Sequence, residues 1–307
     1  MSNPYLTNDP YFGESEKAKK QRAELGVPTI PQASAPGYGT QAYGAPAYGT
    51  ATLPPQPVPG QPYPTDRLED AYSMPAATPY ETGRMTYDDV IMKTALVLGT
   101  IVLFGAAAWV LPGALGMPGL QGPLMWIGLI GGLGLGLVNS FKREPSPALI
   151  MAYAAFEGVL LGSISAMYES FYDGIVLQAV IATVGTFAGM LALFKSGKIR
   201  NTPKFQRIVM VAGLGFVIFS VVNLIMGLGF GVGGGWGLRT GPLGVVIGLV
   251  AIALAAAFLV IDFDNIQKGV QRGAPAKYAW AAAFGLAVTL VWMYLEFLRL
   301  LAILRGD

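Results

Sequence analysis

Residues 241–263 read GPLGVVIGLVAIALAAAFLVIDF, an apolar run that carries a single carboxylate near its end. A helix of 23 residues extends about 34 Å at 1.5 Å per residue, which is enough to cross a hydrocarbon core of about 30 Å. In lipid the backbone amides and carbonyls find no water, so they must bond within the helix itself. This stretch therefore predicts a transmembrane helix.

Six further apolar runs of similar length precede and follow this one. Together the seven predicted spans cover roughly 90–111, 122–140, 148–168, 174–194, 207–228, 241–263 and 279–302. Glycines are frequent in the second and fifth spans, at Gly131, Gly132, Gly134, Gly136, Gly213 and Gly215. Small residues let helix backbones approach closely in lipid, so the pattern favours a tightly packed, all-α polytopic membrane protein.

Composition excludes several classes of function. Charged residues make up 12% of the 307, against about 25% in a soluble protein, and the chain has neither histidine nor cysteine. Disulfides, cysteine-built metal sites, Ser-His-Asp catalysis and histidine metalloprotease motifs are therefore absent. No Gly-x-Gly-Asp motif of intramembrane aspartyl proteases occurs either. We expect no enzymatic activity and no cofactor, and the net charge of +2 does not indicate nucleic-acid binding.

Residues 1–85 differ from the rest of the chain. They hold 14 of the 22 prolines and 8 of the 14 tyrosines, and they show no helical or strand period. Such a composition cannot bury enough apolar surface to offset the entropy of ordering, so we predict a disordered tail at 1–85 and a membrane domain at 86–307. The exception is Glu14–Leu25, where alternating charges permit a short helix.

Basic residues in the short loops predict the orientation. Ten lie after the second, fourth and sixth spans, at Lys142, Arg143, Lys195, Lys198, Arg200, Lys204, Arg207, Lys268, Arg272 and Lys277. The opposite loops hold only Arg239. The positive-inside rule then places the N-terminal tail in the cytoplasm and, after seven crossings of the plasma or inner membrane, the C-terminus outside. A re-entrant last helix would return the C-terminus to the inside.

Ionisable groups inside a span cost about 2.5–3.5 kcal/mol each, so an intramembrane carboxylate is a functional candidate. Glu157 lies near the middle of the third span. It predicts an ion or proton site, or else a protonated acid that bonds across a helix contact. Asp262 and Asp264 end the sixth span. They point about 200° apart, so one faces the bundle and the other faces water, where Lys268 is a candidate partner.

Glu296 lies in the last span, three residues before Arg299. This spacing allows an ion pair within the helix, which would need no functional explanation. By helical rise Glu296 stands about 25 Å above the start of its span, so a carboxylate pair with Asp262 requires a displaced or broken last helix.

In this order, the features resemble the Bax inhibitor-1 family, or transmembrane BAX inhibitor motif proteins, in its bacterial YccA-like branch. The resemblance covers roughly 86–305 and includes the Arg-rich loop before the fifth span, the Asp262-Phe-Asp-Asn-Ile266 ending of the sixth and Tyr278-Ala-Trp280 before the seventh. It implies seven helices, with the last one central and three on either side.

In such relatives the aspartate that ends the sixth helix faces a second aspartate in the last helix, and the pair is implicated in a proton-sensitive gate for calcium leak. Alignment on Trp280 puts the second position near Val288, where this chain has no carboxylate. This chain therefore differs from such relatives at the second aspartate, and Glu157 and Glu296 are the candidates to replace it.

Two functions follow as hypotheses. The first is a passive, pH-sensitive cation leak that carries calcium, because carboxylate oxygens suit this ion. Its pathway or gating groups would be Glu157, Asp262, Asp264 and Glu296, with Arg299 as an ion-pair partner. The alternative is a non-enzymatic regulator whose tail binds another membrane protein, a membrane AAA protease of the FtsH type, as YccA-like relatives are thought to do. The oligomeric state stays open.

Overall fold

The computed structural model describes residues 11, 15–25, 83–142, 144–231 and 237–306. Seven long helices dominate these residues: α4 (Tyr87–Ala114), α5 (Gln121–Phe141), α6 (Pro147–Phe171), α7 (Ile175–Lys195), α8 (Pro203–Phe230), α9 (Gly241–Gln271) and α10 (Tyr278–Gly306). Each is long and apolar enough to cross a membrane. The prediction of an all-α, multi-pass membrane protein is confirmed.

The helix ends carry local signals that explain where they lie. Thr86 caps α4 in a reciprocal pair with Asp89, in which each side chain accepts a hydrogen bond from the other residue's backbone amide. Thr202 caps α8 through the amide of Phe205, and Pro203 occupies the first turn. A short 3-10 turn, η1 (Pro118–Leu120), leads into α5.

One predicted boundary differs by more than a few residues. The predicted sixth span ends at 263, whereas α9 continues to Gln271 before Gly273 ends the helix with φ +63°. The polar residues beyond 263 stay helical because they pack on protein, and Asp264 bonds to Lys268 one turn later. Asp262 therefore lies about 14 Å inside the end of α9 rather than at that end.

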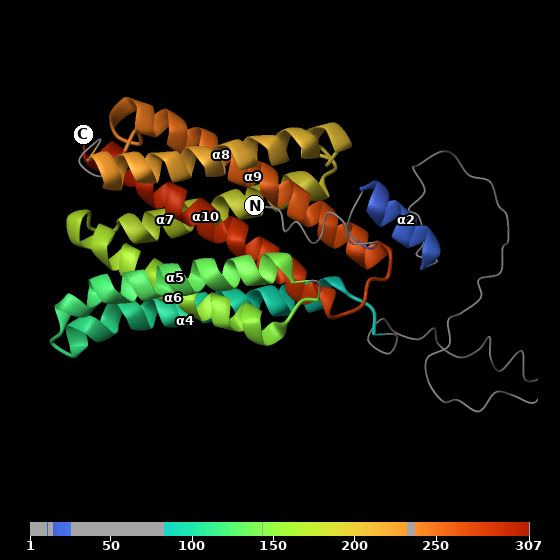
Figure 1. Ribbon diagram of the computed structural model, residues 1–307, viewed down its shortest axis with the longest axis horizontal. Coiled ribbons are helices and arrows are strands. Elements are labelled where there is room, and N and C mark those ends of the chain that lie inside the picture. Colours follow the sequence, from blue (N-terminus) through green and yellow to red (C-terminus); the bar gives the residue numbers. More distant parts are fainter. Residues whose placement is uncertain (1–10, 12–14, 26–82, 143, 232–236, 307) are drawn as a thin grey trace, which may run out of the picture.

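Helix α10 runs through the middle of the bundle (Figure 1), with α4, α5 and α6 on one side and α7, α8 and α9 on the other. This is the arrangement that the family resemblance implies. Because α10 is one continuous helix from Tyr278 to Gly306, its two ends lie at opposite ends of the bundle, which agrees with seven crossings rather than a re-entrant last helix.

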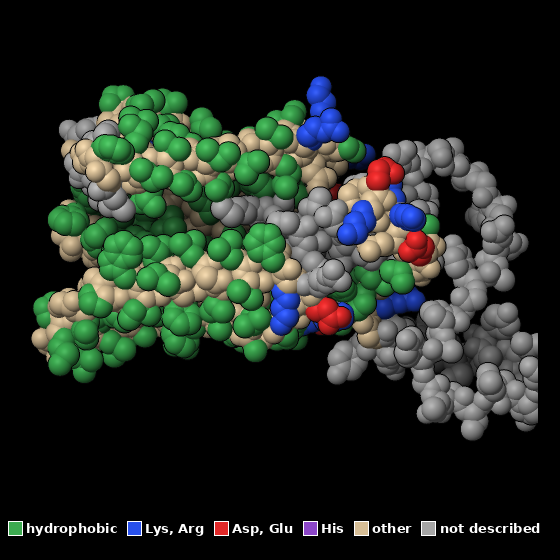
Figure 2. Space-filling view, in the orientation of Figure 1, with side chains coloured by type: hydrophobic (Ala, Val, Ile, Leu, Met, Phe, Trp, Pro, Cys, Tyr) green, Lys and Arg blue, Asp and Glu red, His purple; other side chains and the backbone are tan. Residues whose placement is uncertain are grey.

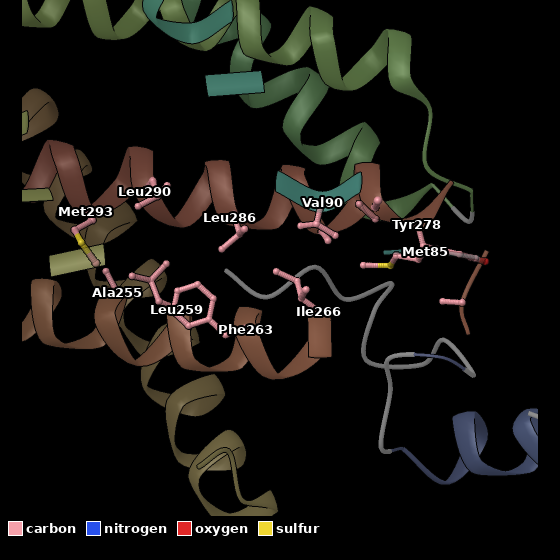
Figure 3. Close-up of a cluster of buried hydrophobic side chains, with 14 residues drawn as sticks. Met85, Val90, Ala255, Leu259, Phe263, Ile266, Tyr278, Leu286, Leu290 and Met293 are labelled. Atoms are coloured by element: carbon pink, nitrogen blue, oxygen red, sulfur yellow. The ribbon is translucent and has the colours of Figure 1, made fainter. Parts of the chain in front are cut away.

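Apolar side chains fill the spaces around α10. Figure 3 shows the cluster between α9 and α10, where Leu259 and Phe263 meet Leu286 and Leu290. Met85, just before α4, closes this cluster, and its amide donates to the carbonyl of Ala274 in the α9–α10 turn. A second cluster packs α10 against α4, α6 and α7.

Glycines bring α4, α5 and α6 close together. A Cβ added at Gly162 would meet the backbone of Gly105 in α4, at 2.7 Å from its Cα, and one added at Gly128 would meet Leu160 in α6. A Cβ at Gly134 would have no atom within 4 Å. Close packing is thus confirmed for some glycines, while others only line the outer surface.

The outside of the bundle is apolar along its length. Figure 2 shows hydrophobic side chains over the helices, whereas Lys, Arg, Asp and Glu gather toward one end. This end, called the basic end below, carries the α5–α6, α7–α8 and α9–α10 turns. An exposed apolar belt of this extent is what a lipid-facing surface requires.

The predicted tail falls mostly on residues outside the described ones, but the short charged helix is present as α2 (Glu16–Glu24), capped by Ser15. Tyr11 is also described. Its carbonyl accepts a hydrogen bond from Arg272 at 3.0 Å, and its ring lies 6.0 Å from that of Tyr278. Part of the N-terminal region therefore contacts the α9–α10 turn.

Candidate functional site: Asp262 and Thr289 between α9 and α10

Asp262 lies inside the bundle, between α9 and α10. It is only 8% exposed, and its Oδ2 accepts a hydrogen bond of 2.7 Å from Thr289 Oγ1 of α10. Thr289 stands eleven residues after Tyr278, or about 16 Å along α10, so the pair lies well inside the span from both helices. A Cβ added at Gly285 would stand 3.5 Å from Asp262 Oδ1, an ordinary van der Waals distance, so the carboxylate lies against this part of α10.

The hydroxyl of Thr289 has a second acceptor. Its Oγ1 also lies 3.1 Å from the carbonyl oxygen of Gly285, one turn earlier in α10. A hydroxyl has one proton and two lone pairs, so it can donate to an ionised carboxylate, or accept from a protonated one while it donates to the carbonyl. The arrangement accommodates both protonation states of Asp262 by rotation of one hydroxyl.

Asp264 faces the other way, as the 200° rotation predicts. Its Oδ2 lies 2.9 Å from Lys268 Nζ and accepts a hydrogen bond of 2.8 Å from Asn201 Nδ2. The expected pairing with Lys268 is confirmed. Asp264 thus ties α9 to the α7–α8 turn at the basic end and takes no part in the Asp262 site.

Glu157 lies in a third environment, between α6 and α5. It is 9% exposed, and a Cβ added at Gly132 would lie 2.6 Å from its Oε2, so the carboxyl fills the space that this glycine leaves. Glu157 forms no hydrogen bond or ion pair with any residue that the structure describes. The hydrogen bond across a helix contact that the sequence suggested for Glu157 is not formed there.

Glu296 forms a buried ion pair, but not the one that the spacing favours. Its Oε2 pairs with a guanidinium nitrogen of Arg239, which precedes α9, and both side chains are 6% exposed. The same guanidinium lies 5.2 Å from the ring centroid of Phe216 in α8. Arg299 is near enough to interact electrostatically with both Glu296 and Arg239. Charged groups at this end of α10 thus form one cluster.

The structure does not bring the predicted carboxylates together. Asp262 faces α10, Glu157 faces α5, and Glu296 faces the segment before α9. Glu296 is seven residues beyond Thr289, about 10 Å along α10, which agrees with the expectation that it forms no dyad with Asp262. Within the described ranges no group of three acidic side chains is arranged to hold a metal ion.

Two residues of these sites escaped the sequence reasoning. Alignment on Trp280 puts the second family position near Val288, and the residue that faces Asp262 is its neighbour Thr289, while Val288 itself packs into the second apolar cluster. A hydroxyl at a helical position carries little signal because it tolerates both lipid and protein surroundings. Arg239 was counted as a loop cation, yet it is buried.

Comparison with known proteins agrees with this architecture. The family model described as "Bax inhibitor 1 like" matches residues 3–306, nearly the whole chain. An uncharacterized protein of Borreliella burgdorferi is 24% identical over 177 residues, which are 56% of this chain and 69% of that protein. No solved structure matches the chain. The match over nearly the full length shows that the chain belongs to the Bax inhibitor-1-like family.

Proposed function

We propose that this protein is a passive, pH-sensitive cation leak pathway in the plasma or inner membrane, with Asp262 and Thr289 as its gate and calcium as its transported ion. The observation that supports this most is a carboxylate held in the middle of a bundle by a neutral hydroxyl, with no ion pair to a described Lys or Arg. Structural carboxylates in a span are usually neutralised by a cation, as Glu296 is by Arg239.

The chemistry of the pair explains how protons would act without histidine. Thr289 can share a hydrogen bond with Asp262 in both protonation states, but only an ionised Asp262 adds a negative charge and offers two oxygens to a cation. The change of one proton then alters the charge of the path and the direction of the hydrogen bond between α9 and α10. Glu157, Asp264 and Glu296 lie elsewhere, so we assign them no part in this gate.

In this function the protein catalyses no reaction and needs no bound cofactor. The calcium ion is the species that it transports. We infer that the basic end faces the cytoplasm, because it carries the Lys- and Arg-rich turns. The N-terminal region would then be cytoplasmic and the end of α10 outside.

A liposome flux assay tests the proposal. Purified protein is reconstituted in vesicles loaded with a calcium-sensitive dye, and calcium entry is followed from pH 5 to pH 8. We expect pH-dependent entry that Asp262→Asn makes independent of pH, while Asp264→Asn, a neighbouring carboxylate outside the gate, keeps the pH dependence. Equal calcium entry into empty and protein-bearing vesicles refutes the proposal.

A second candidate function is regulation of a membrane AAA protease of the FtsH type through the N-terminal region. The contacts of Tyr11 with Arg272 and Tyr278 support it, because they connect this region to the α9–α10 turn at the basic end. Crosslinking pull-down with and without residues 1–82 is the test. An unchanged set of captured partners after the deletion argues against this function.

A further inference from the structure

A cavity of about 370 Å³ opens at the basic end, where the end of α7 and the α7–α8 turn meet α9. Its wall includes Phe194, Lys195, Arg200, Asn201 and Asp264. Phe194 belongs to the lipid-facing helix α7 and packs on Phe263 at a ring distance of 5.7 Å. The cavity therefore stands where the apolar belt gives way to the charged end.

The charges of this cavity do not cancel. Its one carboxylate, Asp264, is already paired with Lys268 at 2.9 Å and bonded to Asn201. Lys195 and Arg200 are exposed, and neither forms an ion pair with any residue that the structure describes. Two unneutralised cations on one cavity wall favour an anionic ligand.

Asn201 adds a second, independent indication. Its Nδ2 donates to Asp264, while its Oδ1 is buried and has no hydrogen-bond partner among the described atoms. A buried acceptor without a donor destabilises the site, so a ligand that brings a hydroxyl would relieve this cost. The cavity wall thus has positive charges that can bind a phosphate and an amide carbonyl that can accept a hydrogen bond from a hydroxyl.

From these features we propose that the cavity binds the headgroup of an anionic phospholipid with a hydroxylated headgroup, such as phosphatidylglycerol. Lys195 and Arg200 contact the phosphate, and Asn201 Oδ1 accepts from a headgroup hydroxyl. Phe194 gives the cavity an apolar wall where it packs on Phe263. Anionic lipids at the membrane surface attract all basic residues to some degree. The proposed site differs because the lipid binds at one place, the cavity beside the α7–α8 turn.

The experiment compares two double variants of the full chain in lipid nanodiscs that contain labelled phosphatidylglycerol in phosphatidylcholine. Lys195→Gln with Arg200→Gln removes two charges from the cavity wall. Lys198→Gln with Lys204→Gln removes two charges from the α7–α8 turn and the start of α8, outside that wall. We expect about 10- to 30-fold weaker binding of phosphatidylglycerol for the first variant and less than about 2-fold for the second. Thermal unfolding of both variants checks that they fold.

Two further ligands test whether the site recognises the headgroup hydroxyl and whether it requires a lipid. Phosphatidylmethanol has the same charge without a headgroup hydroxyl, so we expect it to bind about 5-fold more weakly because Asn201 Oδ1 stays unsatisfied. Soluble glycerol phosphate should not compete at equal concentration. An equal loss in both double variants would reduce the site to general surface electrostatics and overturn the proposal. Equal binding of phosphatidylmethanol, or competition by glycerol phosphate, would overturn the headgroup or the lipid assignment.

Discussion

The buried cluster at the end of α10 predicts an unusual order of stabilities. Glu296 is the acceptor of the Arg239 pair and also interacts with Arg299, so one carboxylate serves two guanidinium groups. Substitution Glu296→Leu removes the carboxylate between the buried Arg239, whose side chain is 6% exposed, and the half-buried Arg299, and these two like charges repel each other. Breaking a buried pair in this way costs about 3–5 kcal/mol.

Substitution Arg239→Met acts differently, because Glu296 keeps Arg299 as a neighbour. The loss is one hydrogen-bonded ion pair and the cation–π contact with Phe216, which together correspond to about 1–3 kcal/mol. In the Glu296→Leu background, however, the same change removes one of two repelling charges. We therefore expect Arg239→Met to destabilise the wild-type protein but to stabilise the Glu296→Leu variant.

Equilibrium unfolding in mixed detergent and sodium dodecyl sulfate micelles measures all four proteins of this cycle. The double variant should be more stable than Glu296→Leu alone by about 1 kcal/mol or more. Phe216→Leu is a matched control, because it removes the ring under Arg239 without a change of charge. If the two single effects simply add, Arg239 and Glu296 are not coupled and the reasoning fails.

Three further predictions follow from local contacts. Gly162→Ala should destabilise the protein by about 1–3 kcal/mol, because its Cβ meets the α4 backbone, whereas Gly134→Ala should be neutral or slightly stabilising; detergent unfolding measures both. Thr289→Val should change the pH dependence of calcium flux, while Thr289→Ser, which keeps the hydroxyl, should preserve it; equal profiles would contradict the gate. Arg272→Gln should increase proteolysis around Tyr11, since one of its hydrogen bonds holds that residue; an unchanged cleavage rate would mean that this bond contributes little.

The number, order and approximate bounds of the spanning helices were predictable from the sequence. A spanning helix satisfies its own backbone, so its presence depends on the length of one apolar run and on nothing distant. The same argument failed for the end of α9, where polar residues remain helical because Lys268 and Asn201 bind Asp264.

The candidate site was predictable only in part. The rotation of 100° per residue correctly separated Asp262 from Asp264, because both lie on one helix. It did not reveal that Thr289 rather than Val288 faces Asp262, since this depends on how α10 is rotated against α9.

By itself the sequence determined the membrane class, the seven spans, the short charged helix and the absence of histidine and cysteine chemistry. These are properties of composition and of local helix geometry. Tertiary structure alone decided the partners: Thr289 for Asp262, Arg239 for Glu296, and no bonded partner among the described residues for Glu157. The reason is that the residues concerned lie on different segments of the chain. Which of their side chains meet depends on how the helices pack against one another.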